Sequence, residues 1–138
     1  VDVITGFPGE TDDEFEQTFN FISSLPLSYL HVFPYSDRPL AKASKYTDHI
    51  HQHVIRQRVN RLLELGNEKQ HDFFSEHAGT VRSLLVEGTR KNGLQFGFTD
   101  NYIKCAIPES SVIENEIHRV LLNYQADNED FMFAQVID

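Results

Sequence analysis

A glycine- and proline-containing turn stands near the start of the chain, between an apolar run and an acidic one. It reads Gly6-Phe7-Pro8-Gly9-Glu10. Glycines at such a turn let a ligand approach the backbone closely, and a helix that starts there offers free N–H groups. A plain strand-to-helix turn explains the same residues, because short glycine motifs often arise by chance. On spacing alone the plain turn is the better interpretation.

A second group of polar side chains follows the next apolar run. It combines a phenol, a hydroxyl, a carboxylate and a guanidinium, on Tyr35, Ser36, Asp37 and Arg38. The carboxyl ends of parallel strands meet at one edge, so this group would lie on the same rim as the first turn. Arg38 could bind a carboxylate or phosphate. Alternatively, Asp37 and Arg38 pair weakly at a solvated turn, and the sequence leaves both interpretations open.

Histidine and cysteine offer little for metal chemistry. His49 and His53 are spaced to share a helical face, as two metal ligands would. Two ligands do not make a site, so we expect a solvated first turn and no metal. The single cysteine, Cys105, lies in a strand-like run, where we expect a small buried core residue. One cysteine excludes an internal disulfide or cysteine-rich metal site and fits a reducing cytoplasm.

Aromatic and basic residues occur together in the last third of the chain. The aromatic ones are Phe96, Phe98 and Tyr102, and the basic ones are Arg90, Lys91 and Lys104. Aromatics on a small barrel can stack on unpaired bases, or they can fill its core, because alternate strand residues point inward. We expect most of these rings in the core. Arg90 and Lys91 are expected in an exposed turn that could contact phosphate.

The first half of the chain has the pattern of a β-α-β unit. β-rich runs at residues 1–5 and 29–33 flank a helix that begins with a capping box, Thr11 with Glu14. Parallel strands with a right-handed crossover follow from this order. Phe15, Phe19 and Ile22 would form the apolar stripe of the helix.

A second, longer helix is expected from a cap at Asp48 to about His77. Its apolar face would carry Ile55 and Leu62, whereas Arg56, Arg58 and Arg61 would project mostly elsewhere. Gly66-Asn67 marks a possible kink or break near its middle.

The pattern changes at Gly79, where short β-rich runs separated by polar turns begin. About five short strands predict a small antiparallel β-barrel. We therefore predict an α/β part over residues 1–77 and an all-β domain over residues 78–138.

The overall charge and hydropathy narrow the choice of partners. The net charge of −9 disfavours tight nonspecific binding to nucleic acid, so we expect no DNA partner. No apolar run approaches the length of a membrane span, and we expect a cytoplasmic protein. The chain starts inside an apparent strand and without Met, so we expect residues upstream of Val1.

Segments of the whole chain, in order, resemble the radical SAM (S-adenosylmethionine) methylthiotransferases. Residues 2–11 look like their Gly-Phe-Pro-Gly-Glu-Thr segment, and residues 31–39 like a later strand and loop. Residues 85–87 and 97–103 look like their terminal RNA-binding TRAM domain. The His-Val-Phe-Pro-Tyr-Ser and Asn-Tyr-Ile runs most resemble the branch that acts on threonylcarbamoyladenosine in tRNA.

This resemblance implies a fold, cofactors and a partner. Residues 1–77 would be the last β-α-β part of a radical SAM TIM-like barrel with a long helix, and residues 78–138 the TRAM domain. The cofactors would be S-adenosylmethionine and two [4Fe–4S] clusters. The partner would be the anticodon loop of tRNA, methylthiolated on an adenine.

The resemblance also implies roles for residues, none of them catalytic. Gly6, Phe7, Pro8, Gly9 and Glu10 would lie along bound S-adenosylmethionine. Tyr35, Ser36 and Arg38 would lie near that cofactor or the modified base. Arg90, Lys91 and Lys104 would contact RNA.

Two departures limit what this chain can do alone. Leu40-Ala41 stands where the family has Gly-Thr, which changes what that loop can contact. The cluster cysteines are absent, so we expect the chain to be inactive without about 300 further residues of a barrel of typical size. The alternatives are a methylthiotransferase for isopentenyladenosine tRNA or a ribosomal protein, and a non-catalytic RNA-binding module.

Overall fold

The computed structural model describes residues 1–109, 114–125 and 129–137. The chain divides into two compact units, Val1–Gln70 and His71–Asp138. The division falls inside a long helix, whereas the sequence places the domain boundary at the end of that helix. The last turns of the helix belong to the second unit because Phe74 is fully buried there and His71 Nδ1 lies 2.7 Å from Gln125 Oε1.

The first unit contains the predicted β-α-β motif. Strands β1 (Asp2–Thr5) and β2 (His31–Pro34) pair in parallel, joined through α1 (Asp12–Ser24). The capping box is present: Thr11 Oγ1 accepts from the Glu14 N–H at 3.2 Å, and the Glu14 carboxylate accepts from the Thr11 N–H at 2.8 Å. The sequence prediction for this segment is confirmed.

The second helix, α2 (Gln52–His77), starts later than expected. Asp48 does not cap it, because the Asp48 carbonyl accepts a hydrogen bond from the Gly9 N–H at 2.9 Å and that segment stays non-helical. A short 3-10 helix, η1 (Lys42–Lys45), lies ahead of it. The helix does not break at Gly66, where a Cβ would stand 3.2 Å from Leu30 Cβ. Glycine at this position permits close packing of α2 against Leu30, the residue before β2.

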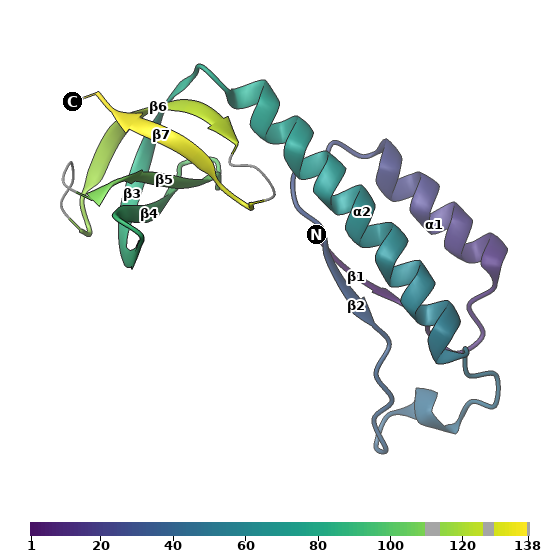
Figure 1. Ribbon diagram of the computed structural model, residues 1–138. Coiled ribbons are helices and arrows are strands. Elements are labelled where there is room, and N and C mark those ends of the chain that lie inside the picture. The colour runs from purple at the N-terminus through teal and green to yellow at the C-terminus, as the bar shows by residue number, and fades with distance from the viewer. Residues whose placement is uncertain (110–113, 126–128, 138) are drawn as a thin grey trace. The chain divides into compact units, whose positions relative to one another are not determined.

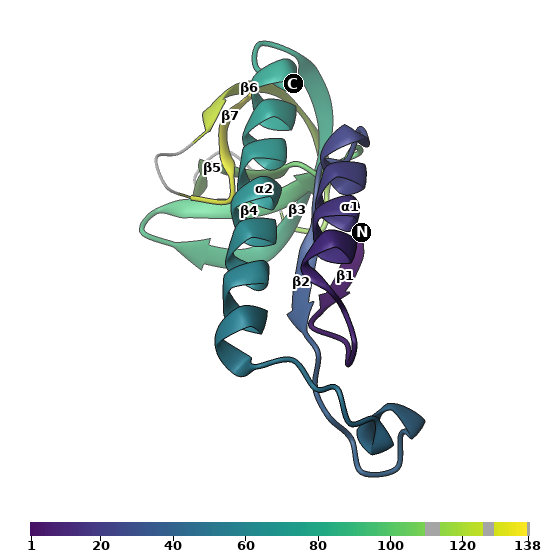
Figure 2. The same ribbon diagram turned by 90° about the vertical axis from the view of Figure 1, so that its right-hand side faces the viewer.

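Both helices of the first unit cover the same face of the strand pair (Figures 1 and 2). Their core consists of Phe15, Ile22, Leu62 and Leu65, packed against Val3, Phe19, Leu27, Leu30 and Val32. On the opposite face, Ile4 and Phe33 are neighbours in register and are 64% and 49% exposed. One face of this two-stranded sheet is therefore apolar and is not covered by the described residues.

The second unit is a closed five-stranded barrel with the order β3-β4-β5-β7-β6 (Figure 1). Its strands are β3 (Val81–Lys91), β4 (Leu94–Thr99), β5 (Lys104–Pro108), β6 (Ile117–Gln125) and β7 (Met132–Val136). The prediction of a wholly antiparallel barrel is wrong, because β5 and β7 pair in parallel. A ring with an odd number of strands cannot alternate direction throughout, so closure leaves one parallel pair.

The barrel interior contains apolar side chains from β3, β5, β6 and β7, and the polar side chains of Gln95 and Thr99 from β4. The apolar ones include Leu84, Val86, Ile107, Val120, Leu122 and Met132, each at most 1% exposed. The tight turn between β3 and β4 is Asn92-Gly93, with φ values of 54° and 76°. Asn-Gly is the preferred pair for a two-residue hairpin, because both residues tolerate a positive φ. Among the described residues, no helix is long and apolar enough to span a membrane.

Candidate functional site

The turn between β1 and α1 is closed by its own glutamate. The Glu10 carboxylate accepts hydrogen bonds from Thr5 Oγ1 at 3.0 Å and from the Gly6 N–H at 3.1 Å. Arg58 Nη1 of α2 donates to the same carboxylate at 2.5 Å and to the Glu10 carbonyl at 3.0 Å. Glu10 thus binds both ends of the turn and ties it to the helix.

Arg58 is a structural residue that the sequence analysis misplaced. Its side chain is 6% exposed, and its Nη2 also donates to Asp12 Oδ1 at 2.7 Å. Ile55 precedes it by three residues and Leu62 follows by four, so all three share the buried helical face. This spacing from Ile55 and Leu62 could have predicted from the sequence that Arg58 is buried. Arg61, as expected, lies nearer the surface, where it pairs with Glu16.

The glycines of the turn are required by close contacts within the chain. Gly6 has φ of 87°, and a Cβ there would lie 2.6 Å from Ile55 Cγ1. Gly9 has φ of 85°, and a Cβ there would lie 2.5 Å from Asp48 Oδ2. The space in front of each glycine is therefore occupied by a side chain of this protein.

The N–H groups of the turn are also used internally. The Gly9 N–H donates to the Asp48 carbonyl and the Glu10 N–H to the Phe7 carbonyl, both at 2.9 Å. With the Gly6 N–H bound to Glu10, these three donors are hydrogen-bonded within the chain. The turn therefore fits the wall of a ligand site rather than a set of hydrogen-bond donors.

The exposed part of the turn is the Phe7 ring, which belongs to an aromatic cluster. The centroids of Phe7 and Tyr35 are 5.5 Å apart, and those of Phe7 and Tyr46 are 6.1 Å apart. The Tyr35 N–H donates to the Thr5 carbonyl at 2.8 Å, which holds the ends of β1 and β2 together. The structure thus brings Tyr35 beside the first turn and adds Tyr46, which sequence reasoning missed.

The remaining polar residues of this rim lie in solvent. Tyr35 Oη donates weakly to Asp37 Oδ1 at 3.4 Å, and desolvation together with the Asp37 charge raises the pKa of Tyr35. Ser36 and Arg38 are exposed. The Ala41 N–H donates to the Arg38 carbonyl at 2.8 Å, so residues 38–41 form a turn that leaves Leu40 in solvent.

The residues described do not fit an iron–sulfur cluster or another metal site. His49 precedes α2, so His49 and His53 do not share a helical face. No group of three or more potential metal ligands occurs within residues 1–109, 114–125 and 129–137. Cys105 is fully buried, and burial raises the pKa of its thiol to about 12, so it is a core residue as predicted.

The aromatic residues of the barrel divide between core and surface. Phe96 is buried, as expected, against Ala106 and Phe131. Phe98 and Tyr102 are 38% and 75% exposed, so the expectation of a core position is wrong for both. Phe96 and Phe98 are two residues apart and share the outer face of β4, where Phe131 packs against Phe96. Tyr102 lies in the turn before β5 with φ of 65°.

Two of the three predicted RNA-contacting cations are already paired. Arg90 lies 3.2 Å from a Glu109 carboxylate oxygen, and Lys104 Nζ lies 3.0 Å from both carboxylate oxygens of Asp130. Lys91 is exposed and has no ion-pair partner in the described part of the chain. Exposed pairs are weak, so Arg90 and Lys104 can exchange a carboxylate for a phosphate.

Comparison with known proteins identifies the relatives of this chain. No family model matches. The chain is 40% identical over 103 residues to the threonylcarbamoyladenosine tRNA methylthiotransferase MtaB of Aquifex aeolicus, which covers 74% of this chain and 24% of that protein. It is 39% identical over 107 residues to MtaB of Bacillus subtilis, with 75% and 24% covered.

A third relative acts on a different nucleoside. The chain is 33% identical over 91 residues to the tRNA-2-methylthio-N(6)-dimethylallyladenosine synthase of Bdellovibrio bacteriovorus, with 66% of this chain and 20% of that protein covered. The chain therefore belongs to the methylthiotransferase family that its motifs resemble. Within it, the similarity is higher to the two MtaB proteins. The chain spans about a quarter of the length of these relatives.

Proposed function

We propose that this chain is the carboxy-terminal part of a tRNA-modifying enzyme that methylthiolates the adenine of threonylcarbamoyladenosine by radical SAM chemistry. The observation that carries this proposal is the 40% and 39% identity to two MtaB proteins, against 33% to 37% to dimethylallyladenosine synthases. The substrate is taken to be the adenosine beside the anticodon.

In this proposal the first unit is the last β-α-β part of a TIM-like barrel. The exposed face with Ile4 and Phe33 supports it, because a barrel strand needs further side chains against its inner face. The turn at residues 6–10 would then form a wall beside S-adenosylmethionine. Tyr35, Ser36 and Arg38 would line the same rim, near the cofactor or the modified base.

The iron–sulfur clusters would be bound outside this chain. They would supply the radical and sulfur-transfer chemistry, for which the residues described here provide no ligands. The roles left for this chain are to shape the rim and to hold the RNA. We propose that the chain alone has no methylthiotransferase activity.

The five-stranded barrel would be a TRAM domain that holds the tRNA. Support comes from the exposed Phe98 and Tyr102 and from Lys91, for which the described residues contain no ion-pair partner. Arg90 and Lys104 would contribute once their carboxylate partners are displaced by phosphates. The excess of acidic residues in the whole chain implies that the barrel alone binds tRNA weakly.

Mass spectrometry of tRNA nucleosides tests the proposal. Cells lacking the gene should lose methylthio-threonylcarbamoyladenosine and accumulate its precursor without the methylthio group. Complementation with the intact gene should restore the modified nucleoside. Unchanged amounts of every methylthio nucleoside in the deletion strain would show that the tRNA proposal is wrong.

The same experiment distinguishes a second candidate substrate. The 33% identity to the dimethylallyladenosine synthase favours this alternative over a protein substrate. If the deletion strain loses only the methylthio derivative of dimethylallyladenosine, the family assignment stands and the branch assignment is wrong.

A further inference from the structure

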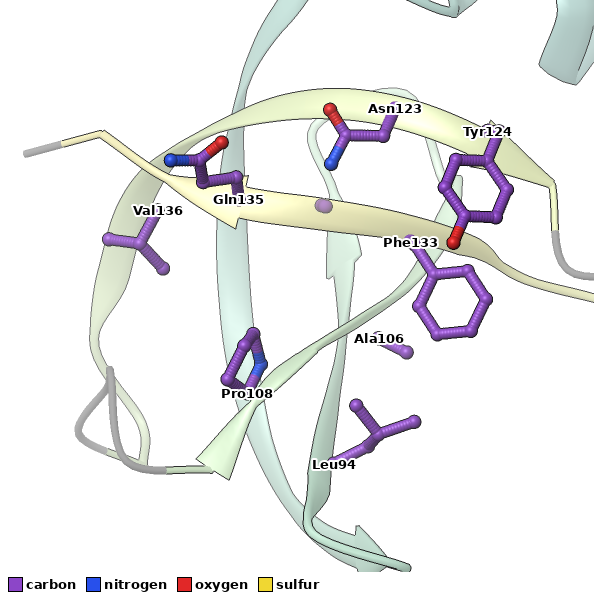
Figure 3. A pocket seen from close by; sticks show the side chains of 9 residues that line it. Leu94, Ala106, Pro108, Asn123, Tyr124, Phe133, Gln135 and Val136 are labelled. Carbon is purple, nitrogen blue, oxygen red and sulfur yellow. The ribbon is translucent and has the colours of Figure 1, made fainter.

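A groove of about 660 Å³ lies on the outside of the barrel, where β5 and β7 separate (Figure 3). The two strands pair only at Cys105–Met132 and Ala106–Phe133. Beyond these pairs β5 continues alongside β4 and β7 alongside β6. The groove follows directly from the one parallel pair of the barrel, which is short.

The floor and one wall of the groove are apolar, and the two rings of the wall are tilted by 45° to each other. Ala106, which is 1% exposed, provides a small side chain on the floor, with Leu94 and Pro108 along β4 and β5. Phe133 and Tyr124 form an aromatic wall, with ring centroids 5.1 Å apart. Tyr124 is 62% exposed although it lines the groove, so one ring is available for a further contact.

The polar groups at the groove are uncharged hydrogen-bonding groups. Asn123 and Gln135 place exposed amides at its edge (Figure 3). The N–H and C=O of Leu122 both bond to residues 79–80, so they point away from β7. By the alternation of antiparallel pairing, the N–H and C=O of Ala134 and Val136 point away from β6, toward the groove. Beside Val136 no described strand pairs on that side.

Lys91 has no ion-pair partner among the described residues, and this cation favours an anionic chain beside the groove. None of its lining residues is charged, although the protein has a net charge of −9. Lys91 is opposite Leu94 in register, and Lys104 precedes Ala106 by two residues. Lys104 is paired with Asp130, so it can bind a phosphate only after it releases that carboxylate. Glu109 follows Pro108, and Asp130 precedes Phe133 by three residues. Their carboxylates are paired with Arg90 and Lys104.

We infer that this groove binds an unpaired nucleobase of RNA, stacked against Tyr124 and Phe133, with adjacent phosphates toward Lys91 and Lys104. Aromatic side chains stack on any base, and side-chain amides pair with base edges. Asn123, Gln135 and the backbone of Val136 supply such donors and acceptors around an apolar floor. The inference deepens the proposed function, on which it rests, by giving the RNA a base-binding site next to the basic end of β3 at Arg90 and Lys91, which lie in that strand and not in the expected turn.

The inference is tested by measuring the equilibrium binding of fluorescent RNA to the complete protein that the gene encodes. The probes are a short oligoadenylate, whose bases are free, and a blunt RNA duplex, whose bases are already stacked. We expect the oligoadenylate to bind more tightly. Tyr124→Ala should weaken its binding by about 5- to 150-fold, the value of one base–aromatic stack, and Tyr124→Phe should retain most of the affinity.

Two further variants separate the groove from general effects. Gln135→Ala should weaken binding less than Tyr124→Ala, because it removes a base-edge contact and no stacking. Phe21→Ala removes a ring of similar exposure (63%) from α1 and should leave affinity unchanged. Thermal melting of each variant checks that the fold is retained.

Each outcome decides between the proposals. If Tyr124→Ala and the unaltered protein bind oligoadenylate with equal affinity, the inference that the groove binds a base is wrong, and the proposed function is unaffected. Equal binding of duplex and oligoadenylate, or no RNA binding at all, would likewise overturn the groove. The nucleoside analysis tests the enzyme separately, because its result does not depend on where the barrel contacts RNA.

Discussion

In the first unit, the polar residues of the turn stabilise the structure and are not free to act on a ligand. Glu10 lies within the turn that the sequence presents as a ligand loop, yet its carboxylate is bound by Thr5, Gly6 and Arg58. A buried arginine with a partner removed leaves an uncompensated charge, which is costly. The polarity of this turn therefore stabilises the protein itself, and any ligand would meet mainly its aromatic side.

Replacement of Arg58 tests this interpretation. Arg58→Ala should lower the free energy of unfolding by about 3–5 kcal/mol, because it leaves the partly buried Glu10 carboxylate without its cation. Arg61→Ala, a matched change at a half-exposed pair, should cost only about 0–1 kcal/mol. Urea unfolding monitored by circular dichroism measures both. Equal costs for the two variants would contradict a structural role for Glu10.

Replacement of Gly6 separates backbone strain from steric contact. Gly79 has a φ of 78°, similar to that of Gly6, but has open space where a Cβ would lie. Gly79→Ala should therefore cost only the strain of a left-handed conformation, about 1–2 kcal/mol. Gly6→Ala adds a clash with Ile55 and should therefore lower the melting temperature more than Gly79→Ala does. Thermal unfolding of both variants measures this difference. A similar loss in both variants would show that Ile55 moves aside without cost.

At the scale of the element, α1 is defined by local sequence signals. Its capping box satisfies orphan N–H groups, and three acidic residues in its first turn suit the helix dipole. The barrel strands, by contrast, depend on partners distant in sequence. Helix α1 is therefore the element whose stability a single local substitution should change most simply.

Replacement of the cap gives a prediction with a pH dependence. Thr11→Ala should destabilise the protein by about 0.5–2 kcal/mol, and Thr11→Ser should be nearly neutral. The hydrogen bonds from Thr11 lower the pKa of Glu14 below its ordinary value of 4.5. The stabilisation by Glu14 is thus present above that value and is lost as the pH falls through the lowered pKa. The difference in unfolding free energy between Thr11→Ala and the unaltered protein should be smaller at acidic than at neutral pH. It should not vanish, because the hydrogen bond from the Glu14 N–H to Thr11 Oγ1 does not titrate.

At the scale of the whole molecule, the exposed face of the β1–β2 pair is the main liability. Ile4 and Phe33 lie side by side in register, and the described residues pair no further strand with either edge. Open edges and uncovered apolar faces promote association. The 138-residue chain should therefore self-associate when produced alone.

Sedimentation velocity measures this association. The chain alone should sediment as a concentration-dependent mixture, and Ile4→Lys should shift it toward monomer. Val81→Lys, a similar change at an exposed strand residue of the barrel, should have a smaller effect. A monodisperse monomer of the unaltered chain would contradict the prediction.

The sequence by itself determined the elements whose signals are local. The capping box, the apolar stripe of α1, the parallel β-α-β order and the buried Cys105 depend on residue type and short spacings. The family also follows from the sequence, because the short motifs and their order can be recognised without the contacts that they make.

Only the tertiary structure decided how distant residues meet. The Glu10–Arg58 contact joins residues 48 positions apart, and the Phe7–Tyr35–Tyr46 cluster joins three separate segments. The parallel closure of β5 on β7, and hence the groove, follows from strand order around a ring, which local spacing does not encode. The exposure of Phe98 and Tyr102 depends likewise on strand register and turn geometry, which pairing across the barrel sets.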